Sequence, residues 1–308
     1  MLYDLAIIGG GPAGTAAGVY ASRKRLHTVL IAEAYGGQST VSEDIQNWIG
    51  TPHISGLNLA TSFETHLKTY AENIVDLKVP MRVSHIAKAG DHFKIETSQG
   101  ETFEAKTVLI AVGSTRRKLT VPGADIYENK GITYCASCDG PVFSDQDVVV
   151  IGGGNAGFES AAQLAAYCKS VTILHKNAEF KADEVTVGKV LAKPNVKSIL
   201  NAELLSVEGD TFVTGLTYKD KVSGETKQLP VTGIFVEIGL IPSTDFVGDV
   251  VEKNAAGQIV IDPRTQQTKT SGIWAAGDCT DVLYHQNNIA AGDAVRALED
   301  IYLHIHAK

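Results

Sequence analysis

The strongest constraint on the fold is an internal repeat of the sequence. Residues 5–33 read LAIIGGGPAGTAAGVYASRKRLHTVLIAE, and they align without a gap with residues 148–176, VVVIGGGNAGFESAAQLAAYCKSVTILHK. In each copy a short apolar run leads through a glycine turn into an Ala-rich helical stretch and a second β-branched run, which is typical of a β-α-β unit. The copies are too far apart for a solenoid, whose period is roughly 20–50 residues. The repeat therefore predicts two related nucleotide-binding domains.

The segments around the two copies predict how these domains are connected. Residues 81–104 and 212–236 alternate between apolar and polar side chains, as antiparallel strands do. We therefore predict an α/β fold class with two Rossmann-like, three-layer ββα dinucleotide-binding domains, the second inserted into the first. The first domain is predicted to be discontinuous, at residues 1–115 and 245–308, and the second to span residues 116–244.

Composition disfavours several classes of partner. The chain has 308 residues, of which 44% are hydrophobic and 20% charged, so it can bury a sizeable core. Its formal net charge of −8 disfavours nucleic acid and anionic membrane surfaces, because both are negatively charged. No apolar run approaches the ~20 residues that span a bilayer, and the N-terminus lacks the basic region of a signal peptide. We therefore expect a cytoplasmic protein with no nucleic-acid or membrane partner.

The first glycine turn has the features of a dinucleotide-binding site. Gly9, Gly11 and Gly14 follow a predicted strand and open a predicted helix. Glycines at this spacing let backbone N–H groups approach a pyrophosphate at the positive end of the helix dipole. Glu33 falls at the end of the second strand, where a carboxylate accepts hydrogen bonds from a ribose diol. The turn predicts a site for FAD or NAD, and a glycine turn without a ligand is the alternative.

The second glycine turn, at residues 152–157, differs at the ribose position. The ungapped equivalent of Glu33 is Lys176, preceded by His175 and followed by Lys181. These cations replace the diol acceptor and offer partners to a 2′-phosphate, which favours NADPH at this site. The alternative is that both lysines belong to a solvated surface without a ligand.

Cys135 and Cys138 form the candidate reaction centre, with Asp139 beside them. Two intervening residues allow the sulfurs to meet in a small ring. In a reducing compartment such a pair indicates redox or metal chemistry rather than a structural disulfide. A structural zinc site is the main alternative, but it requires four ligands, and the other two cysteines, Cys168 and Cys279, are isolated in the sequence. We therefore predict no metal.

A few loop residues are weaker candidates. Asp278 follows a predicted buried strand and can bond a ligand hydroxyl, for example in a flavin ribitol, although a Gly-Asp pair is also an ordinary turn. Gly37, Gln38 and Asn47 lie in loops that could line a cofactor, and only comparison with a known family singles them out.

Two dinucleotide motifs with a CxxC placed just before the second one form a more specific signal than any one part. Together they resemble the low-molecular-weight thioredoxin reductase family of FAD-dependent disulfide reductases, over essentially the whole chain. The second half is also similar to the reductase part of the alkyl hydroperoxide reductase flavoprotein, notably in YKDKVSG at 218–224. The matching pieces are GGGPAG at 9–14, GGQ at 36–38, CASCDG at 135–140, GGGNAG at 152–157, GIFVEIGLIPST at 233–244, AAGDC at 275–279 and the His285-Gln286 segment.

The resemblance implies a reaction and a set of residues. Electrons pass from NADPH on the inserted domain to FAD on the first domain, and then to the disulfide of the CxxC motif. Cys138 is implied to face the flavin, Cys135 to attack the disulfide of thioredoxin or of a thioredoxin- or glutaredoxin-like protein, and Asp139 to carry the proton. The inserted domain is expected to rotate between two states, and the protein to be a homodimer. The implied FAD-binding residues are Gly9, Gly11, Pro12, Ala13, Gly14, Glu33, Gly37, Gln38, Asn47, Gly113, Asp278 and Gln286, and the implied NADPH-binding residues are Gly152, Gly154, Asn155, Ala156, Gly157, His175, Lys176 and Lys181.

One motif departs from the family pattern. NADPH-using members carry HRRxxxR, whereas this chain has His175, Lys176 and Asn177, followed by Lys181. The charge is partly kept but the bidentate arginine fork is absent, which predicts weaker binding of a 2′-phosphate. NADH or another electron donor is therefore the alternative to NADPH.

Other activities on the same fold stay open. The chain could serve a peroxiredoxin system, act as a dithiol oxidase that passes electrons to O₂, or sense redox state without turnover. Because the sequence begins at the strand of the first glycine turn, we expect the electron acceptor to be a separate polypeptide.

Overall fold

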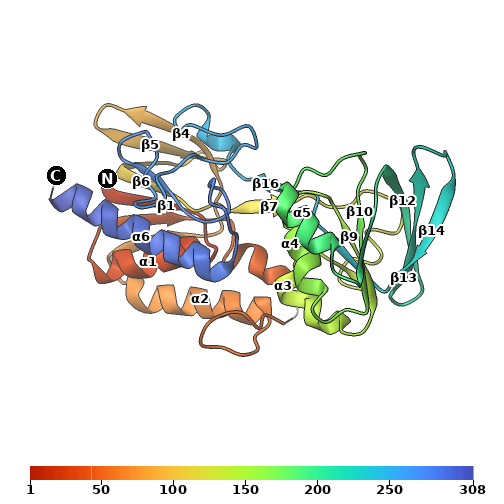
Figure 1. Ribbon diagram of the computed structural model, residues 1–308. Helices are drawn as coiled ribbons and strands as arrows, with labels where there is room; N and C mark the ends of the chain where they lie inside the picture. The colour runs from red at the N-terminus through yellow and green to blue at the C-terminus, as the bar shows by residue number, and fades with distance from the viewer. Residues whose placement is uncertain (43, 308) are drawn as a thin grey trace. The chain divides into compact units, whose positions relative to one another are not determined.

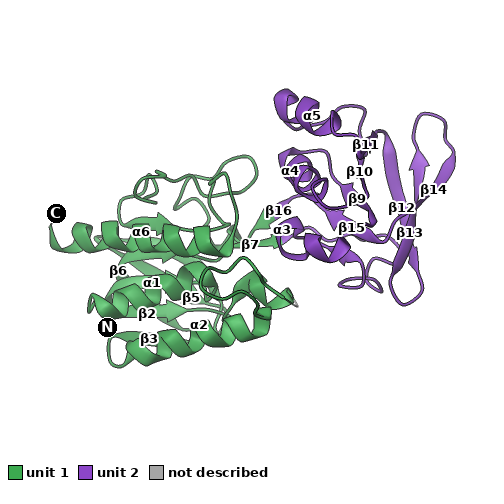
Figure 2. Cartoon of the chain, turned by 60° about the horizontal axis from the view of Figure 1, so that its bottom comes forward, with its two compact units in different colours: residues 1–115, 241–308 green, residues 116–240 purple. Residues whose placement is uncertain are grey.

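The computed structural model describes residues 1–42 and 44–307, with the elements shown in Figure 1. The chain divides into two compact units, and Figure 2 colours them separately. Unit 1 comprises residues 1–115 and 241–308, and unit 2 comprises residues 116–240, so residues 241–244 group with unit 1. Both units contain parallel sheets with helices, and the predicted α/β fold class is confirmed.

Unit 1 is built on a parallel sheet whose order is β3-β2-β1-β6. Strand β6 is long enough to have two partners on one side. Its first half pairs with β5, which belongs to an antiparallel meander with β4, and its second half pairs with β17. The strands are β1 (Leu2–Ile8), β2 (Thr28–Ile31), β3 (Val75–Lys78), β4 (Val83–Ala89), β5 (His92–Thr97), β6 (Thr102–Ile110) and β17 (Ile273–Ala275).

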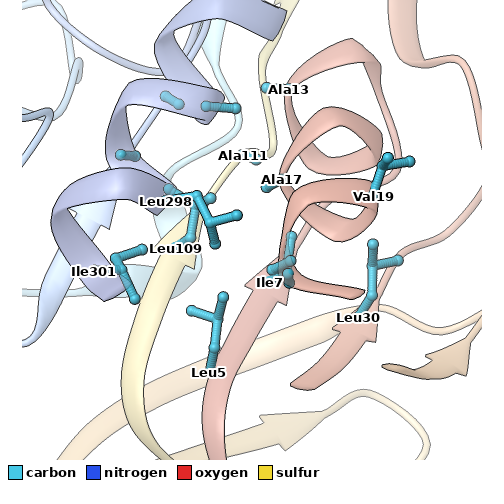
Figure 3. Close-up of a cluster of buried hydrophobic side chains, with 14 of the residues drawn as sticks. Leu5, Ile7, Ala13, Ala17, Val19, Leu30, Leu109, Ala111, Leu298 and Ile301 are labelled. Carbon is cyan, nitrogen blue, oxygen red and sulfur yellow. The ribbon is translucent and has the colours of Figure 1, made fainter. Parts of the chain in front are cut away.

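The two faces of this sheet bury different clusters because side chains alternate along a strand. Leu5 and Ile7 of β1 pack against α1 (Pro12–Arg23) and α6 (Asn287–His306), as Figure 3 shows. Ala6 and Ile8 belong to the cluster on the other face, which includes side chains of β4 and β5. Helix α2 (Gly56–Ala71) lies on the same side as α1, against which it packs. This gives the three layers that the ββα prediction expects.

Unit 2 repeats the plan on a smaller scale. Its five parallel strands follow the order β11-β10-β9-β15-β8, with helices on one face and a three-stranded antiparallel sheet, β12-β13-β14, on the other. The antiparallel strands predicted within residues 212–236 are β13 and β14, but a third strand, β12, precedes them. The elements are β8 (Ile132–Thr133), α3 (Ala136–Asp139), β9 (Asp147–Ile151), α4 (Asn155–Leu164), β10 (Ser170–Leu174), α5 (Glu184–Leu191), β11 (Val196–Ile199), β12 (Ala202–Gly209), β13 (Val213–Asp220), β14 (Thr226–Pro230) and β15 (Gly233–Val236).

The chain passes between the units twice, through β7 (Ser114–Arg116) and β16 (Leu240–Pro242), and these two strands pair with each other. Short 3₁₀ turns occupy Gly37–Val41, Gly140–Phe143 and Asp245–Val247. No described helix has the length and apolar character needed to cross a membrane.

Leu109 provides a test of the core of unit 1, because its side chain is fully buried between β1, α1 and α6. We expect Leu109→Ala to lower the free energy of unfolding by about 2–5 kcal/mol, since truncation leaves a cavity. Both tryptophans, Trp48 and Trp274, belong to unit 1, so their fluorescence during denaturant unfolding follows this unit. The control is Leu57→Ala on α2, where the leucine is 67% exposed. Equal unfolding midpoints for the two variants would contradict this description of the core.

Candidate functional site

The first glycine turn joins β1 to α1 through close backbone contacts. Gly9 has a positive φ of 121°, and a Cβ there would overlap the carbonyl oxygen of Ala111, which follows β6. A Cβ on Gly14 would overlap the carbonyl oxygen of Gly9. Gly11 caps α1 without a side-chain hydrogen bond, and no acidic residue occupies the first turn of the helix. Among the described residues no side chain caps the first N–H groups of α1, so they can bind an anion.

A cavity of about 550 Å³ lies beside this turn, entirely within unit 1. Ser114, which belongs to no sequence motif, also lines it, and its buried hydroxyl has no hydrogen-bond partner among the described residues. An open helix end, a cradle of glycines and an unpaired hydroxyl fit a phosphate-bearing cofactor. The predicted site residues that line the cavity are Gly9, Gly11, Pro12, Ala13, Glu33, Gly37, Gln38, Gly113 and Asp278.

Glu33 lies at the end of β2, as the alignment of the two copies predicts, and its side chain is 67% exposed. The Nε atom of Arg82 is 3.7 Å from its Oε1 atom, and both residues line the cavity. Arg82 precedes β4 in the antiparallel meander, so no local sequence signal connects it with the glycine turn. At this exposure the ion pair contributes little to stability, and the carboxylate stays accessible to a ribose.

Asn47 and Gln286 lie outside the residues that line this cavity. The Nδ2 atom of Asn47 donates to Oε1 of Gln286 at 3.0 Å, and Nδ2 of Asn288 donates to the carbonyl oxygen of Asn47 at 2.7 Å. The two predicted cofactor residues therefore fasten the loop around residue 47 to the start of α6. The sequence could not predict this pairing because 239 positions separate the two side chains.

The second glycine turn has the same backbone geometry as the first. Gly152 has a φ of 130°, and a Cβ there would overlap the carbonyl oxygen of Glu237, which follows β15. A Cβ on Gly157 would overlap the carbonyl oxygen of Gly152. Gly154 caps α4 without a side-chain hydrogen bond. Asn155 and Ala156, the first two residues of α4, are exposed, so this helix end is open to a ligand.

The three basic candidates after β10 differ in their surroundings. Lys176 and Lys181 are exposed, as side chains that meet a ligand phosphate must be. His175 is 7% exposed, and its Nδ1 atom accepts a hydrogen bond from the backbone N–H of Gly153 at 3.1 Å. Burial lowers the pKa of His175 below its ordinary value, and the two lysines act in the same direction. His175 therefore contacts the glycine turn as a neutral ring and is not a third exposed cation.

Cys135 and Cys138 form a disulfide across the first turn of α3, with their Cα atoms 5.3 Å apart. The backbone N–H of Cys138 donates to Sγ of Cys135 at 3.2 Å. The backbone N–H of Cys135 donates to the hydroxyl of Thr133, the last residue of β8. Both cysteines are partly exposed. The redox pair thus lies just beyond the carboxyl end of β8, in the parallel sheet of unit 2.

Asp139 lies in the same turn as the disulfide. Its carboxylate accepts a hydrogen bond from the hydroxyl of Thr133. Burial raises the pKa of Asp139 above its ordinary value, although Thr133 and the positive charge of Arg116 act in the opposite direction. A carboxyl group with a raised pKa keeps its proton to higher pH, which suits a proton carrier beside a thiol pair.

Glu237 is a second partly buried carboxyl group of unit 2, and no sequence motif predicted a role for it. Ser160 on α4 donates a hydrogen bond to its Oε1 atom at 2.6 Å. Burial raises the pKa of Glu237 above its ordinary value. The contact joins residues 77 positions apart, so only the folded chain shows it.

The other two cysteines are buried thiols. Burial raises the pKa of Cys168 to about 11 and that of Cys279 to about 12, so both are protonated near neutral pH. Protonated thiols are poor nucleophiles. Among the described residues no group of three or more His, Cys, Asp or Glu side chains is placed to hold a metal ion.

The burial of Cys168 and Cys279 predicts the outcome of a thiol titration. The native oxidised protein should show no fast-reacting thiol, and the denatured oxidised protein should show two, because the other two cysteines form the disulfide. After reduction, the native protein should show two fast thiols and the denatured protein all four. A thiol-specific chromogenic reagent measures each number. A fast-reacting thiol in the native oxidised protein would contradict the placement of these residues.

Comparison with known proteins places this arrangement in a family. A family model described as pyridine nucleotide-disulphide oxidoreductase matches residues 3–294. An alkyl hydroperoxide reductase subunit of Escherichia coli (strain K12) is 42% identical over 296 residues, which cover 96% of this chain and 57% of that protein. NADH dehydrogenase of Bacillus subtilis (strain 168) is 40% identical over 295 residues, with the same coverage. The chain thus spans about 57% of the length of these curated relatives.

Solved structures match the chain over its whole length. Thioredoxin reductase from Streptococcus pyogenes MGAS5005 has a TM-score of 0.88 and 33% identity, and the match covers 100% of this chain and 99% of that one. Thioredoxin reductase from Giardia duodenalis has a TM-score of 0.90 and 32% identity, with 98% and 99% coverage. The predicted resemblance is confirmed, and the chain belongs to the pyridine nucleotide-disulphide oxidoreductase family.

Proposed function

We propose that the chain is an FAD-dependent disulfide oxidoreductase, which passes electrons from NADPH through FAD and the Cys135–Cys138 disulfide to thioredoxin or a thioredoxin-like protein. The observation that carries the proposal is the position of this disulfide, because it lies in the same unit as the second glycine turn. One unit thus holds a redox pair and a nucleotide turn, and the other holds a glycine turn with a cavity of its own. We assign FAD to unit 1 and the pyridine nucleotide to unit 2.

The cavity of unit 1 supports the assignment of FAD. The open end of α1 would hold the pyrophosphate, and Glu33 would accept hydrogen bonds from the adenosine ribose. Asp278, which follows β17 and lines the same cavity, would bind a hydroxyl of the ribitol chain. When bound, FAD would supply a two-electron acceptor for the hydride of the nucleotide and a two-electron donor for the disulfide.

Residues of unit 2 support a pyridine nucleotide. The open end of α4 would hold its pyrophosphate, and exposed Lys176 and Lys181 would contact the 2′-phosphate of NADPH. NADH is the second candidate, because a relative with 40% identity is named NADH dehydrogenase and because lysines replace the bidentate arginines.

The thiol chemistry of the proposal balances with the groups at hand. Reduction of the Cys135–Cys138 disulfide to two thiols takes two electrons and two protons, and the carboxyl group of Asp139 would pass a proton to the pair. In the next half-reaction Cys135 attacks the partner's disulfide, which forms a mixed disulfide and releases one partner thiol. Cys138 then attacks Sγ of Cys135, which re-forms the Cys135–Cys138 disulfide and releases the second partner thiol. The net change is that the partner gains two electrons and two protons.

The proposal also includes a partner, an oligomeric state and a location. Thioredoxin is our first choice because the matching solved structures are thioredoxin reductases. A peroxiredoxin system is the second, because a relative with 42% identity belongs by name to alkyl hydroperoxide reductase. A homodimer in the cytoplasm stays a prediction.

Serine variants of the redox pair test the proposed electron path. Cys135→Ser and Cys138→Ser should each reduce thioredoxin turnover to background, because a single thiol cannot complete the exchange. Both variants should keep bound FAD and its anaerobic reduction by nucleotide, and the control Cys168→Ala should keep turnover. Turnover by either serine variant would exclude the disulfide from the path. A wild-type protein whose flavin no nucleotide reduces would overturn the proposal and favour the oxidase or sensor alternative. A wild-type protein without flavin would overturn all three.

Lys176→Glu tests the assignment of the nucleotide. It restores the carboxylate that Glu33 provides in the other copy and sets a negative charge against the 2′-phosphate. We expect the ratio of kcat/KM for NADPH to that for NADH to fall about tenfold or more, the size of a charge-assisted hydrogen bond. Lys193→Glu makes the same charge change on an exposed residue outside the loop at 175–181 and should leave the ratio unchanged. Equal ratios in the two variants would contradict a role for Lys176.

A further inference from the structure

His175 is held against the backbone of the second glycine turn. It is the only histidine among residues 116–240, and it follows the last residue of β10. Its Nδ1 atom accepts the N–H of Gly153 at 3.1 Å, and the carbonyl oxygen of Gly153 accepts the backbone N–H of Lys181 at 2.8 Å. The peptide groups on both sides of Gly153 are therefore fixed. Gly153 therefore owes one of these two hydrogen bonds to a side chain that can titrate.

The hydrogen bond determines the protonation state of the ring. An Nδ1 atom that accepts a hydrogen bond carries no proton, so the neutral ring carries its proton on Nε2. The Nε2 atom is buried and has no hydrogen-bond partner among the described residues. Protonation of Nδ1 would set its N–H against the N–H of Gly153, and two donors cannot bond each other. The bond therefore exists only while His175 is neutral.

The groups around His175 favour the neutral ring. Burial lowers its pKa, and the positive charges of Lys176 and Lys181 lower it further, whereas the backbone of Glu179 acts in the opposite direction. The ring of Phe180 lies 5.8 Å away, centre to centre. The backbone N–H of His175 donates to the carbonyl oxygen of Ile199 at 2.8 Å, and the backbone N–H of Ala202 donates to the carbonyl oxygen of His175 at 2.9 Å.

The first glycine turn provides an internal comparison, because the residue equivalent to His175 is Ala32. A Cβ on Gly10 would lie 2.9 Å from Cβ of Ala32, and a Cβ on Gly153 would lie 2.7 Å from Cγ of His175, so the two side chains occupy the same place. The carbonyl oxygen of Gly10 also accepts a backbone N–H, from Gly36 at 2.9 Å. The carbonyl group of Gly10 is thus held by a backbone hydrogen bond, as that of Gly153 is. No titratable side chain accepts the N–H of Gly10 from position 32, because that residue is alanine.

We propose that neutral His175 is a positioning residue for the nucleotide of unit 2, and that protonation of its ring releases Gly153 and weakens binding of the dinucleotide pyrophosphate. The inference rests on the proposed assignment of a pyridine nucleotide to this turn. It gives His175 a role through the backbone, distinct from the charge that Lys176 and Lys181 offer. The FAD site of unit 1 does not share the effect, because alanine replaces the histidine there.

The test measures binding of ADP-ribose to the FAD-loaded protein by calorimetry between about pH 5 and pH 8. ADP-ribose carries the pyrophosphate without a phosphomonoester, so the ligand itself does not titrate in this range. We expect the affinity of the wild-type protein to fall about tenfold from the high to the low end, the size of one hydrogen bond. Bound FAD should stay constant over the same range.

Two variants separate positioning from a merely structural role. His175→Asn keeps an acceptor near the place of Nδ1 without a titratable group, so its affinity should stay close to the wild-type value at pH 8 and vary little with pH. His175→Leu removes the acceptor and should bind weakly at every pH. His85→Asn, at an exposed histidine of unit 1, should behave like wild type. A pH dependence in His175→Asn equal to that of wild type would overturn the proposal.

A second measurement needs no variant. Because linkage is reciprocal, a ligand that prefers neutral His175 must lower the pKa of this ring when it binds. The ring signal of His175, assigned by ¹⁵N NMR, should report a proton on Nε2 at pH 8 and titrate at lower pH when ADP-ribose is present. An unchanged titration, with ADP-ribose bound, would overturn the role of His175. No binding of ADP-ribose at any pH would instead overturn the nucleotide assignment itself.

Discussion

Both candidate sites depend on one steric constraint, the contact of a glycine turn with the backbone that follows the neighbouring parallel strand. In unit 1 this contact joins Gly9 to the carbonyl oxygen after β6, and in unit 2 it joins Gly152 to the carbonyl oxygen after β15. A Cβ at either position would overlap that oxygen. The contact sets where each following helix begins, so the open N–H groups of α1 and α4 lie just beyond the carboxyl ends of β1 and β9. The open helix ends that can bind an anion therefore depend on the absence of a side chain at Gly9 and Gly152.

Unit 2 adds a second feature, a set of titratable groups that burial shifts toward their neutral forms. Asp139 and Glu237 have raised pKa values and His175 a lowered one, and for each the largest cause is burial. Such groups lower the free energy of unfolding over a defined range of pH. Between the ordinary pKa of an aspartic acid and that of Asp139, the unfolded chain releases a proton that the folded chain keeps, so stability falls as the pH rises through that range. The same raised pKa that lowers stability lets Asp139 carry a proton beside the disulfide to higher pH.

How much of the site could be predicted depended on whether the signal was local in the sequence. The glycine turns, Glu33 and the Cys135–Cys138 pair are short patterns, and the structure brings the residues of the first turn together around one cavity. Arg82 and Ser114 line the same cavity, but they come from other parts of the chain and carry no motif. Glu237 was part of a matched segment, yet its contact with Ser160 appears only after two distant elements pack.

The repeat by itself determined that this chain forms two dinucleotide-type units, because a strand, a glycine turn and a helix in succession allow few other arrangements. The CxxC spacing likewise indicated which cysteines can pair, since two intervening residues keep the sulfurs within reach. Tertiary structure decided the protonation states and the partners of the site residues. His175 reads as one of three adjacent cations in the sequence, but packing buries it against Gly153 and makes it a neutral acceptor. Burial and hydrogen bonding are set by residues from separate elements, and for that reason no local pattern contains them.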